Sequence, residues 1–414
     1  MGSNQSEVVP GGAADSPAVS RGVVWLLAAT SGLGVSTIYY AQPMLGILQA
    51  SMHADARSLS FIPTLTQFGY ALGIFFLAPL GDRYDRRRII LCKIAILVAA
   101  LLLNGAASGL GGLWLASPFV GLAATLAQDV IPAAAAMAPD ARRGKVVGTV
   151  MTGLLLGILL SRVVSGLIAE QFGWRAVYFL GAALMAVTGL VAYRRLPSIR
   201  GSTRLGYARL IASLGSLWRQ HEGLRRAVFA QGLLSIAFSG FWTTLAVMLH
   251  HDFHMGSAVA GAFGLAGAAG AVAAPLAGRL ADRSGPRRVT LVGAAWVMLS
   301  FCLMGLGAVL SPAAQLWLLV VATVSFDFGL QIAFVGHQTL VYGLDPAARS
   351  RLNAVLITGV FLGMASGSAL AAQVYARWSW YGVVAQCVIA AALALLLRAE
   401  ALWRGKAGSA AAAR

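Results

Sequence analysis

The sequence predicts an all-α membrane protein whose twelve transmembrane helices form two pseudo-symmetric six-helix bundles. Three observations lead to this fold class. Of the 414 residues, 58% are hydrophobic and only 11% are charged, whereas a soluble globular protein carries about 25% charged residues. The apolar residues gather in continuous runs, and the two halves of the chain repeat the same charged motif. Most of the chain is therefore expected to contact lipid.

Each apolar run is close to the roughly 20 residues that a helix needs to cross a bilayer. The runs are continuous, which excludes a transmembrane β-barrel because its strands alternate apolar and polar residues. The 48 glycines are typical of closely packed membrane helices. The expected spans cover residues 22–45, 60–80, 88–107, 113–137, 146–168, 174–194, 227–249, 257–277, 289–310, 313–336, 353–373 and 381–398.

The widest gap between the runs, residues 195–226, divides the expected spans into two groups of six. Within it, Leu210, Ile211, Leu214 and Leu217 recur at helical spacing, which predicts an amphipathic helix on the inner leaflet. We expect a disordered tail at 1–21, an N-terminal bundle at 22–194, a cytoplasmic central loop at 195–226, a C-terminal bundle at 227–398 and a second tail at 399–414.

Positive charge falls almost entirely on one side of this topology. With both tails on the cytoplasmic side, 26 Lys and Arg residues lie on that side and only Arg57, Arg175 and Arg377 lie on the other. Because cytoplasmic loops are enriched in Lys and Arg, we expect both termini in the cytoplasm and the protein in a bacterial inner membrane. The net charge of +17 does not indicate nucleic-acid binding, because it lines one membrane face rather than forming one patch.

The two halves carry the same sequence features at matching places. Asp82-Arg83, followed by further arginines, comes after the second expected span, and Asp282-Arg283 comes after the eighth. Glycines one helical turn apart, Gly153 and Gly157, recur as Gly359 and Gly363. Such stripes pack helices face to face, and we expect these two to form the seam between the halves. A duplicated six-helix unit with short loops is typical of a secondary transporter.

These features resemble the major facilitator superfamily across essentially the whole chain after residue 21. The fullest match, 278–288, is similar to the family's cytoplasmic gating motif, whereas the first-half copy has Ala78 and Asp85 where glycines are usual. The stretches 39–43 and 67–70 resemble the sugar-efflux and drug–proton antiporter branch.

The resemblance implies a latch on the cytoplasmic side, in which an acidic side chain is held near a helix N-terminus of the opposite half by charge and dipole. The residues of this gate are expected to be Asp82, Arg83, Arg86, Arg87, Asp282, Arg283 and Arg287.

Three ionisable residues lie well inside apolar runs: Asp129 in span four, Arg162 in span five and Asp327 in span ten. A charge at the bilayer centre costs about 2.5–3.5 kcal/mol on insertion scales, so such residues are expected to face a cavity and to have a partner. We interpret one or both carboxylates as proton carriers and Arg162 as a counter-charge or as an anchor for an anionic group. A static pair that fixes helix packing is the alternative, and the sequence leaves open whether Asp129 pairs with Arg162.

Polar side chains in the expected central helices are candidates for lining a substrate cavity, although interhelical hydrogen bonds also explain such residues. Their mixture of aromatic, amide and hydroxyl groups suits a small, partly apolar organic molecule or a sugar. The candidates are Tyr39, Tyr40, Gln42, Gln128, Trp242, Thr243 and Gln331.

The sequence contains no nucleophile–base arrangement, phosphate-binding loop or metal-ligand cluster, so it predicts neither an enzyme nor a cofactor or metal site. We expect a secondary active transporter, functional as a monomer, that exports a drug-like compound or a sugar by alternating access in exchange for protons. One alternative is a proton-coupled importer of a sugar or organic acid. Another is a non-transporting receptor or assembly factor of the same architecture.

Overall fold

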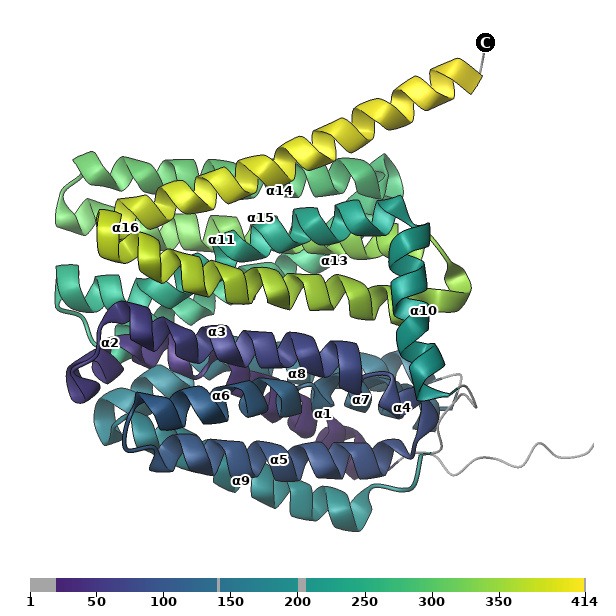
Figure 1. Cartoon of the computed structure of the whole chain (residues 1–414), viewed down its shortest axis with the longest axis horizontal. Helices are drawn as coiled ribbons and strands as arrows, with labels where there is room; N and C mark the ends of the chain where they lie inside the picture. Colours follow the sequence, from purple (N-terminus) through teal and green to yellow (C-terminus); the bar gives the residue numbers. More distant parts are fainter. Residues whose placement is uncertain (1–19, 140–141, 200–205, 413–414) are drawn as a thin grey trace, which may run out of the picture.

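A computed structural model describes residues 20–139, 142–199 and 206–412, with side chains except at 271, 347 and 402–412. Within these residues, eleven helices are long and apolar enough to cross a membrane. The last of them, Arg349–Ala401, contains two spans, because its backbone leaves helical geometry at Trp378 and Ser379. There the chain turns back on itself, as the yellow end of the ribbon shows (Figure 1). The twelve predicted spans are therefore confirmed.

Six spans make up the N-terminal half. Three of them are interrupted helices, and the others are single helices. The first consists of α1 (Arg21–Ser36), η1 (Thr37–Tyr39) and α2 (Ala41–Met52), and the second of α3 (Ala56–Leu72), the π-helical turn η2 (Gly73–Leu77) and α4 (Leu80–Arg83). The others are α5 (Arg86–Ala106), α6 (Leu110–Ala124) with α7 (Leu126–Met137), α8 (Arg143–Phe172) and α9 (Trp174–Arg195).

The C-terminal half repeats this plan. Its spans are α11 (Glu222–Phe253), α12 (Ser257–Ala262) with η4 (Phe263–Ala266) and α13 (Gly267–Ser284), α14 (Pro286–Gly305) with η5 (Leu306–Val309), α15 (Pro312–Tyr342), and the two parts of α16 (Arg349–Ala412). A short turn, η6 (Pro346–Ala348), precedes α16. The two halves lie side by side, with the first half below and the second above (Figure 1).

The predicted amphipathic helix is α10 (Tyr207–Gln220), which lies across one end of both halves (Figure 1). Its Leu210, Leu214 and Leu217 are buried, and Leu214 and Leu217 belong to an apolar cluster with residues of α11 and α16. The Tyr207 hydroxyl donates a hydrogen bond to the Phe76 carbonyl oxygen in the first half, at 2.8 Å. The helix is therefore attached to both halves, and we call this side of the molecule the α10 end.

The glycine stripes pack inside each half, and the prediction that they form the seam between the halves is wrong. In the first half, a Cβ added at Gly153 would collide with Ala28 of α1, and one added at Gly157 would collide with Gly32 of α1. In the second half, a Cβ added at Gly363 would collide with Gly232 of α11. The physical reason is that close backbone approach is needed where the first span crosses the fifth and, by the repeat, where the seventh crosses the eleventh.

Two other helix pairs make the most extensive contacts across the seam between the halves. α3 packs on α16, where the rings of Tyr70 and Phe361 lie 4.1 Å apart between centroids. α8 packs on α12, where the Ser257 hydroxyl donates to the Gly166 carbonyl oxygen at 3.0 Å. Between these pairs an apolar cluster with members from both halves, including Val35, Tyr39, Tyr70, Phe361 and Met364, fills the interface.

Candidate transport site

Arg162 of α8 occupies the middle of this interface. The side chain is buried, and its Nε donates a hydrogen bond to Gln42 Oε1 at 3.0 Å. Its guanidinium carbon lies 4.5 Å from the ring centroid of Tyr39, 4.2 Å from that of Trp242 and 5.6 Å from that of Phe238. Aromatic faces attract a guanidinium group, most strongly where water is excluded. These contacts explain how a charged side chain is tolerated at this depth.

A break in the first span positions Tyr39 and Gln42. The Ser36 hydroxyl donates to the Leu33 carbonyl oxygen at 2.8 Å and the Thr37 hydroxyl to that of Gly34 at 2.7 Å, and such bonds bend helices. Pro43 lies in the first turn of α2, where a missing N–H costs no helical hydrogen bond. The helix therefore restarts at Ala41, and Tyr39 and Gln42 both reach Arg162.

Asp327 of α15 brings the second charge to the site from the opposite half. The side chain is buried, with 7% of the residue exposed. Its Oδ2 lies 3.9 Å from the point where a Cβ atom would stand if Gly267 carried a side chain. Arg162 and Asp327 act on each other electrostatically. Among the described residues, however, their charged atoms form no direct ion pair. The two opposite halves therefore each contribute one buried charge to this site, and the two charges interact without forming an ion pair in direct contact.

Four buried polar atoms of this cluster form no hydrogen bond of good geometry in the described part of the chain, although the Trp242 indole lies close enough to the Asp327 carboxyl group to interact with it. The four atoms are Arg162 Nη2, Gln42 Nε2, Trp242 Nε1 and Asp327 Oδ1. Each belongs to a residue that is less than one-tenth exposed. A buried polar group without a partner is costly, and each such group calls for an explanation, such as an ordered water, an ion or a bound ligand. Of the sequence candidates, the structure brings Tyr39, Gln42, Arg162, Trp242 and Asp327 together.

Asp129 lies elsewhere, inside the N-terminal half. Its Oδ2 is 2.6 Å from Nζ of Lys93 on α5, and both side chains are buried. Asp129 therefore pairs with Lys93 and not with Arg162. Lys93 was not among the sequence candidates, although this residue is charged and lies five residues inside an expected span.

The first copy of the gate motif lies near the beginning of α16, in the opposite half. Asp82 Oδ1 accepts a hydrogen bond from Arg86 Nη2 at 2.7 Å. Asp82 also lines a small crevice together with Ser350 and Arg351 in the first turn of α16, and with Leu210 of α10. This is the arrangement that the latch requires, because a helix N-terminus attracts negative charge.

The other predicted gate residues are not part of this arrangement. Arg87 donates from Nη2 to the Tyr193 carbonyl oxygen of α9 at 2.6 Å, within its own half. Arg83 is exposed and lies over the Tyr84 ring. In the second copy, Asp282, Arg283 and Arg287 are exposed, and Asp282 forms no ion pair within the described residues.

The remaining cavity candidates lie around the central cluster but do not join it. Tyr40 faces α9, where its ring lies against Gly181. Gln128 donates to the Tyr70 hydroxyl at 3.2 Å. Gln331 is half-buried and packs beside Gly270, where its Cβ lies 3.7 Å from the point that a Cβ atom added to the glycine would occupy.

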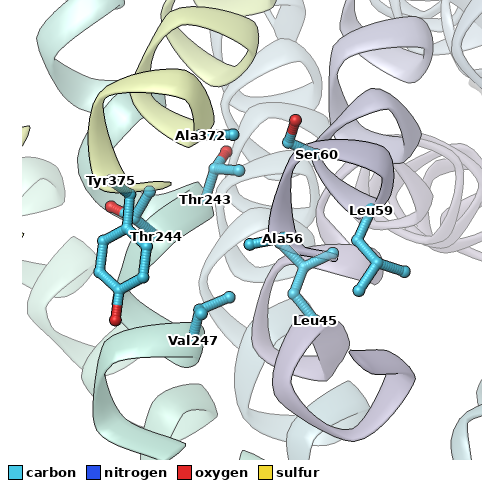
Figure 2. A pocket seen from close by; sticks show the side chains of 9 residues that line it. All are labelled: Leu45, Ala56, Leu59, Ser60, Thr243, Thr244, Val247, Ala372 and Tyr375. Atoms are coloured by element: carbon cyan, nitrogen blue, oxygen red, sulfur yellow. The ribbon is translucent and has the colours of Figure 1, made fainter. Parts of the chain in front are cut away.

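Thr243 lines a separate small pocket between the halves. Figure 2 shows its nine lining side chains, with Leu45, Ala56, Leu59 and Ser60 facing residues of α11 and α16 across the gap. The Thr243 hydroxyl donates to the Ser368 hydroxyl at 3.0 Å. The lining is mostly apolar and carries no charged group.

Sequence comparison agrees with this architecture. The family model of the Major Facilitator Superfamily matches residues 24–225 and 227–412. The uncharacterized transporter YgaY of Escherichia coli O157:H7 is 36% identical over 388 residues, covering 94% of this chain and 96% of that protein. The probable transporter SCO4007 of Streptomyces coelicolor is 35% identical over 390 residues, covering 94% and 88%.

Solved structures share the fold. A bacterial homologue of the human lysosomal transporter Spinster, inward-facing and unoccupied, superposes with a TM-score of 0.72 at 15% identity and covers 91% of this chain and 96% of its own. A mutant of the peptide transporter POT in complex with alafosfalin gives 0.73 at 16% identity, covering 91% and 92%. At these identities the likeness concerns the fold alone.

Twelve spans in two repeated halves, with a buried polar site between them, define a membrane transporter. The chain belongs to the Major Facilitator Superfamily, whose members carry small molecules across membranes. The protein is therefore a transporter and not an enzyme. The resemblance to the sugar-efflux and drug–proton antiporter branch stays a prediction.

Proposed function

We propose that this protein is a proton-coupled exporter of a small organic molecule and that Arg162 and Asp327 form its transport site. The protein would work by alternating access as a monomer in a bacterial inner membrane, with both termini in the cytoplasm. The observation that carries the proposal is the pair of buried charges contributed by opposite halves, which leaves one carboxylate oxygen of Asp327 without a partner.

Asp327 suits a proton carrier because its surroundings change when the halves move. Its nearest fixed charge, Arg162, is attached to the other half. When the halves rock about the site, the distance between the two charges changes, and so does the preference of the carboxylate for a proton. Asp129 is less suited to this role, because Lys93 of the same half holds its carboxylate.

Alternating access requires that contacts across the seam break and re-form. The contacts of Arg162 with Trp242 and of Ser239 with Gln67, at 3.0 Å, join the two halves at the level of the site. The direction of transport rests on the branch that residues 39–43 and 67–70 resemble, and the orientation rests on the distribution of Lys and Arg.

Inside-out vesicles with an acidic interior, reported by a pH-sensitive dye, test the proposal. A panel of sugars, amphiphilic cations, aromatic acids and amino acids is added, and an exporter that exchanges its substrate for protons releases protons when its substrate arrives. We expect at least one compound to raise the interior pH in wild-type vesicles and to have no effect with Asp327→Asn. An equal response from both proteins would remove Asp327 from the mechanism. Uptake into intact cells without any vesicle response would indicate an importer.

A further inference from the structure

We infer that the transport site recognises a zwitterion, a small amino-acid-like molecule with a carboxylate, an ammonium group and an apolar side chain. This inference rests on the proposed transport site and goes further by naming the chemical class of the substrate. It is carried by the hydrogen-bonding character of the four unpartnered atoms, by their arrangement around two opposite charges and by the aromatic rings beside them.

Three of the four unpartnered atoms are donors. Arg162 Nη2, Gln42 Nε2 and Trp242 Nε1 each carry N–H groups and cannot accept a hydrogen bond. All three belong to one cluster, since Arg162 bonds Gln42 and lies against Trp242. A group rich in acceptors is needed to satisfy them. A carboxylate is such a group, and the planar guanidinium of arginine matches its geometry.

The orientation of Arg162 is fixed before any ligand arrives. Gln42 Oε1 accepts from Nε at 3.0 Å, and Tyr39, Trp242 and Phe238 surround the guanidinium group. These contacts leave Nη2 as a buried polar atom without a partner. A side chain held in this way pays little ordering entropy when it binds a carboxylate.

The fourth unpartnered atom, Asp327 Oδ1, is an acceptor when the carboxyl group is ionised. It therefore suits a donor on the ligand, and an ammonium group also matches its charge. An anion without an amine would be repelled by Asp327, and a cation without a carboxylate would be repelled by Arg162. Because a buried charge without compensation is disfavoured, only a molecule with both charges satisfies both sides of the site.

Recognition of this kind couples substrate to protons. A proton on Asp327 removes the anchor of the ammonium group, so that proton and substrate compete for the same carboxylate, as exchange requires. The charged and titratable groups that face Asp327 are Arg162 from α8 and Tyr39 from η1. Arginine stays protonated and tyrosine stays neutral at mild pH, so Asp327 is the group that titrates.

Binding to the purified full-length protein in detergent, without any ion gradient, tests the inference. The probes are L-leucine and L-phenylalanine, each compared with its amide, its deaminated acid and its decarboxylated amine, and melting temperature is measured across ligand concentrations. We expect at least one amino acid to bind, its three analogues to bind at least tenfold more weakly, and binding to weaken as the pH is lowered. Asp327→Asn is expected to bind weakly at every pH.

Three variants separate recognition from folding. Arg162→Gln removes the cation and is expected to weaken binding at least tenfold. Trp242→Phe removes one donor but keeps an aromatic ring, and it is expected to weaken binding at least fivefold. Arg175→Gln is the matched control. Arg175 also stacks on a tryptophan, with its guanidinium carbon 4.2 Å from the Trp174 ring centroid, but it lies outside the site. This control is expected to bind as the wild type does.

Several results would overturn the inference. Equal binding of the deaminated acid would indicate an anion site, equal binding of the amine a cation site, and no binding by either amino acid would exclude the class. The proposed function can fail separately. Amino-acid binding without proton release in vesicles would support the zwitterion inference and contradict proton-coupled export. Proton release by a sugar alone would support proton-coupled export and contradict the zwitterion inference.

Discussion

At the scale of single residues, Arg162 shows how a charge is kept inside a membrane protein. It is surrounded by three aromatic rings and one amide oxygen rather than by a counter-ion in direct contact. The sequence identified Arg162, Asp327, Tyr39, Gln42 and Trp242 as candidates, because polar groups in apolar runs are conspicuous. It could not show that they meet, since Gln42 and Arg162 are separated by 120 positions. Phe238 was missed because a phenylalanine in an apolar run carries no signal.

The pair formed by Lys93 and Asp129 is expected to stabilise the N-terminal half. Removing one partner leaves an uncompensated buried charge, which costs about 3–5 kcal/mol. Lys93→Met and Asp129→Leu should each lower the melting temperature of the purified protein strongly, while the double variant should recover most of the loss. The double variant should also keep proton-coupled transport. Single variants that melt like the wild type would contradict this structural role.

Asp85, which stands where the family motif usually has glycine, caps α5. Burial alone would raise its pKa, but hydrogen bonds from the Ile199 amide, the Ser198 hydroxyl and the Arg87 amide, together with the charge of Arg88, lower the pKa below its ordinary value of 3.8. The carboxylate thus ties the end of the N-terminal half to the start of α5.

Asp85→Ala is expected to destabilise the protein by about 1 kcal/mol, as the loss of a helix N-cap does. Because the pKa is lowered in the folded state, this contribution is present above pH 3.8 and is lost as the pH falls through the lowered pKa. Thermal unfolding of wild type and variant between pH 7 and pH 3 measures it. A difference in stability that stays constant down to pH 3 would exclude the ionic cap.

At the scale of helices, sequence periodicity predicted α10 because three leucines and one isoleucine recur at helical spacing. The glycine stripes predicted close packing but not the partner helix. Spacing within one helix contains no information about which neighbour approaches it, and the first and seventh spans proved to be the partners. The boundary between spans eleven and twelve, which the sequence places between residues 373 and 381, appears in the structure as a turn at Ser379, with φ +53°.

The two copies of the gate motif differ in their contacts, and this predicts unequal roles. Asp82 lies beside the first turn of α16, whereas Asp282 is exposed. A Cβ placed at Gly278 of α13, or at Gly148 of α8, would meet no atom within 4 Å. We therefore expect the first copy, and not the second, to act as a latch in this conformation.

Asp82→Asn should open the α10 end more often, because charge–dipole attraction at a helix N-terminus contributes about 0.3–2 kcal/mol. Labelling of a cysteine introduced at Ala354, which lines the crevice beside Asp82, should become up to about thirtyfold faster. Asp282→Asn is the matched control and should leave the rate unchanged. Equal acceleration by both variants would show that the two latches are equivalent in this state.

At the scale of the whole molecule, two rigid halves meet at a site to which each contributes one charge. The apolar cluster around Tyr39, Tyr70 and Phe361 and the bridge formed by α10 keep the halves together. The central charges lie among contacts that join the halves, so a rocking motion changes the environment of Asp327 more than that of Asp129. This arrangement is the physical basis for assigning proton coupling to Asp327.

The most direct test compares two kinds of transport in proteoliposomes for one compound identified in the vesicle panel. Wild type should accumulate it against its gradient when a pH difference is imposed, and should also exchange labelled for unlabelled compound without one. Asp327→Asn should lose gradient-driven accumulation. It should exchange labelled for unlabelled compound only at raised compound concentration, because the halves can still alternate when the proton site is neutral but the variant binds the compound weakly. Gradient-driven accumulation by Asp327→Asn at the wild-type rate would contradict the account.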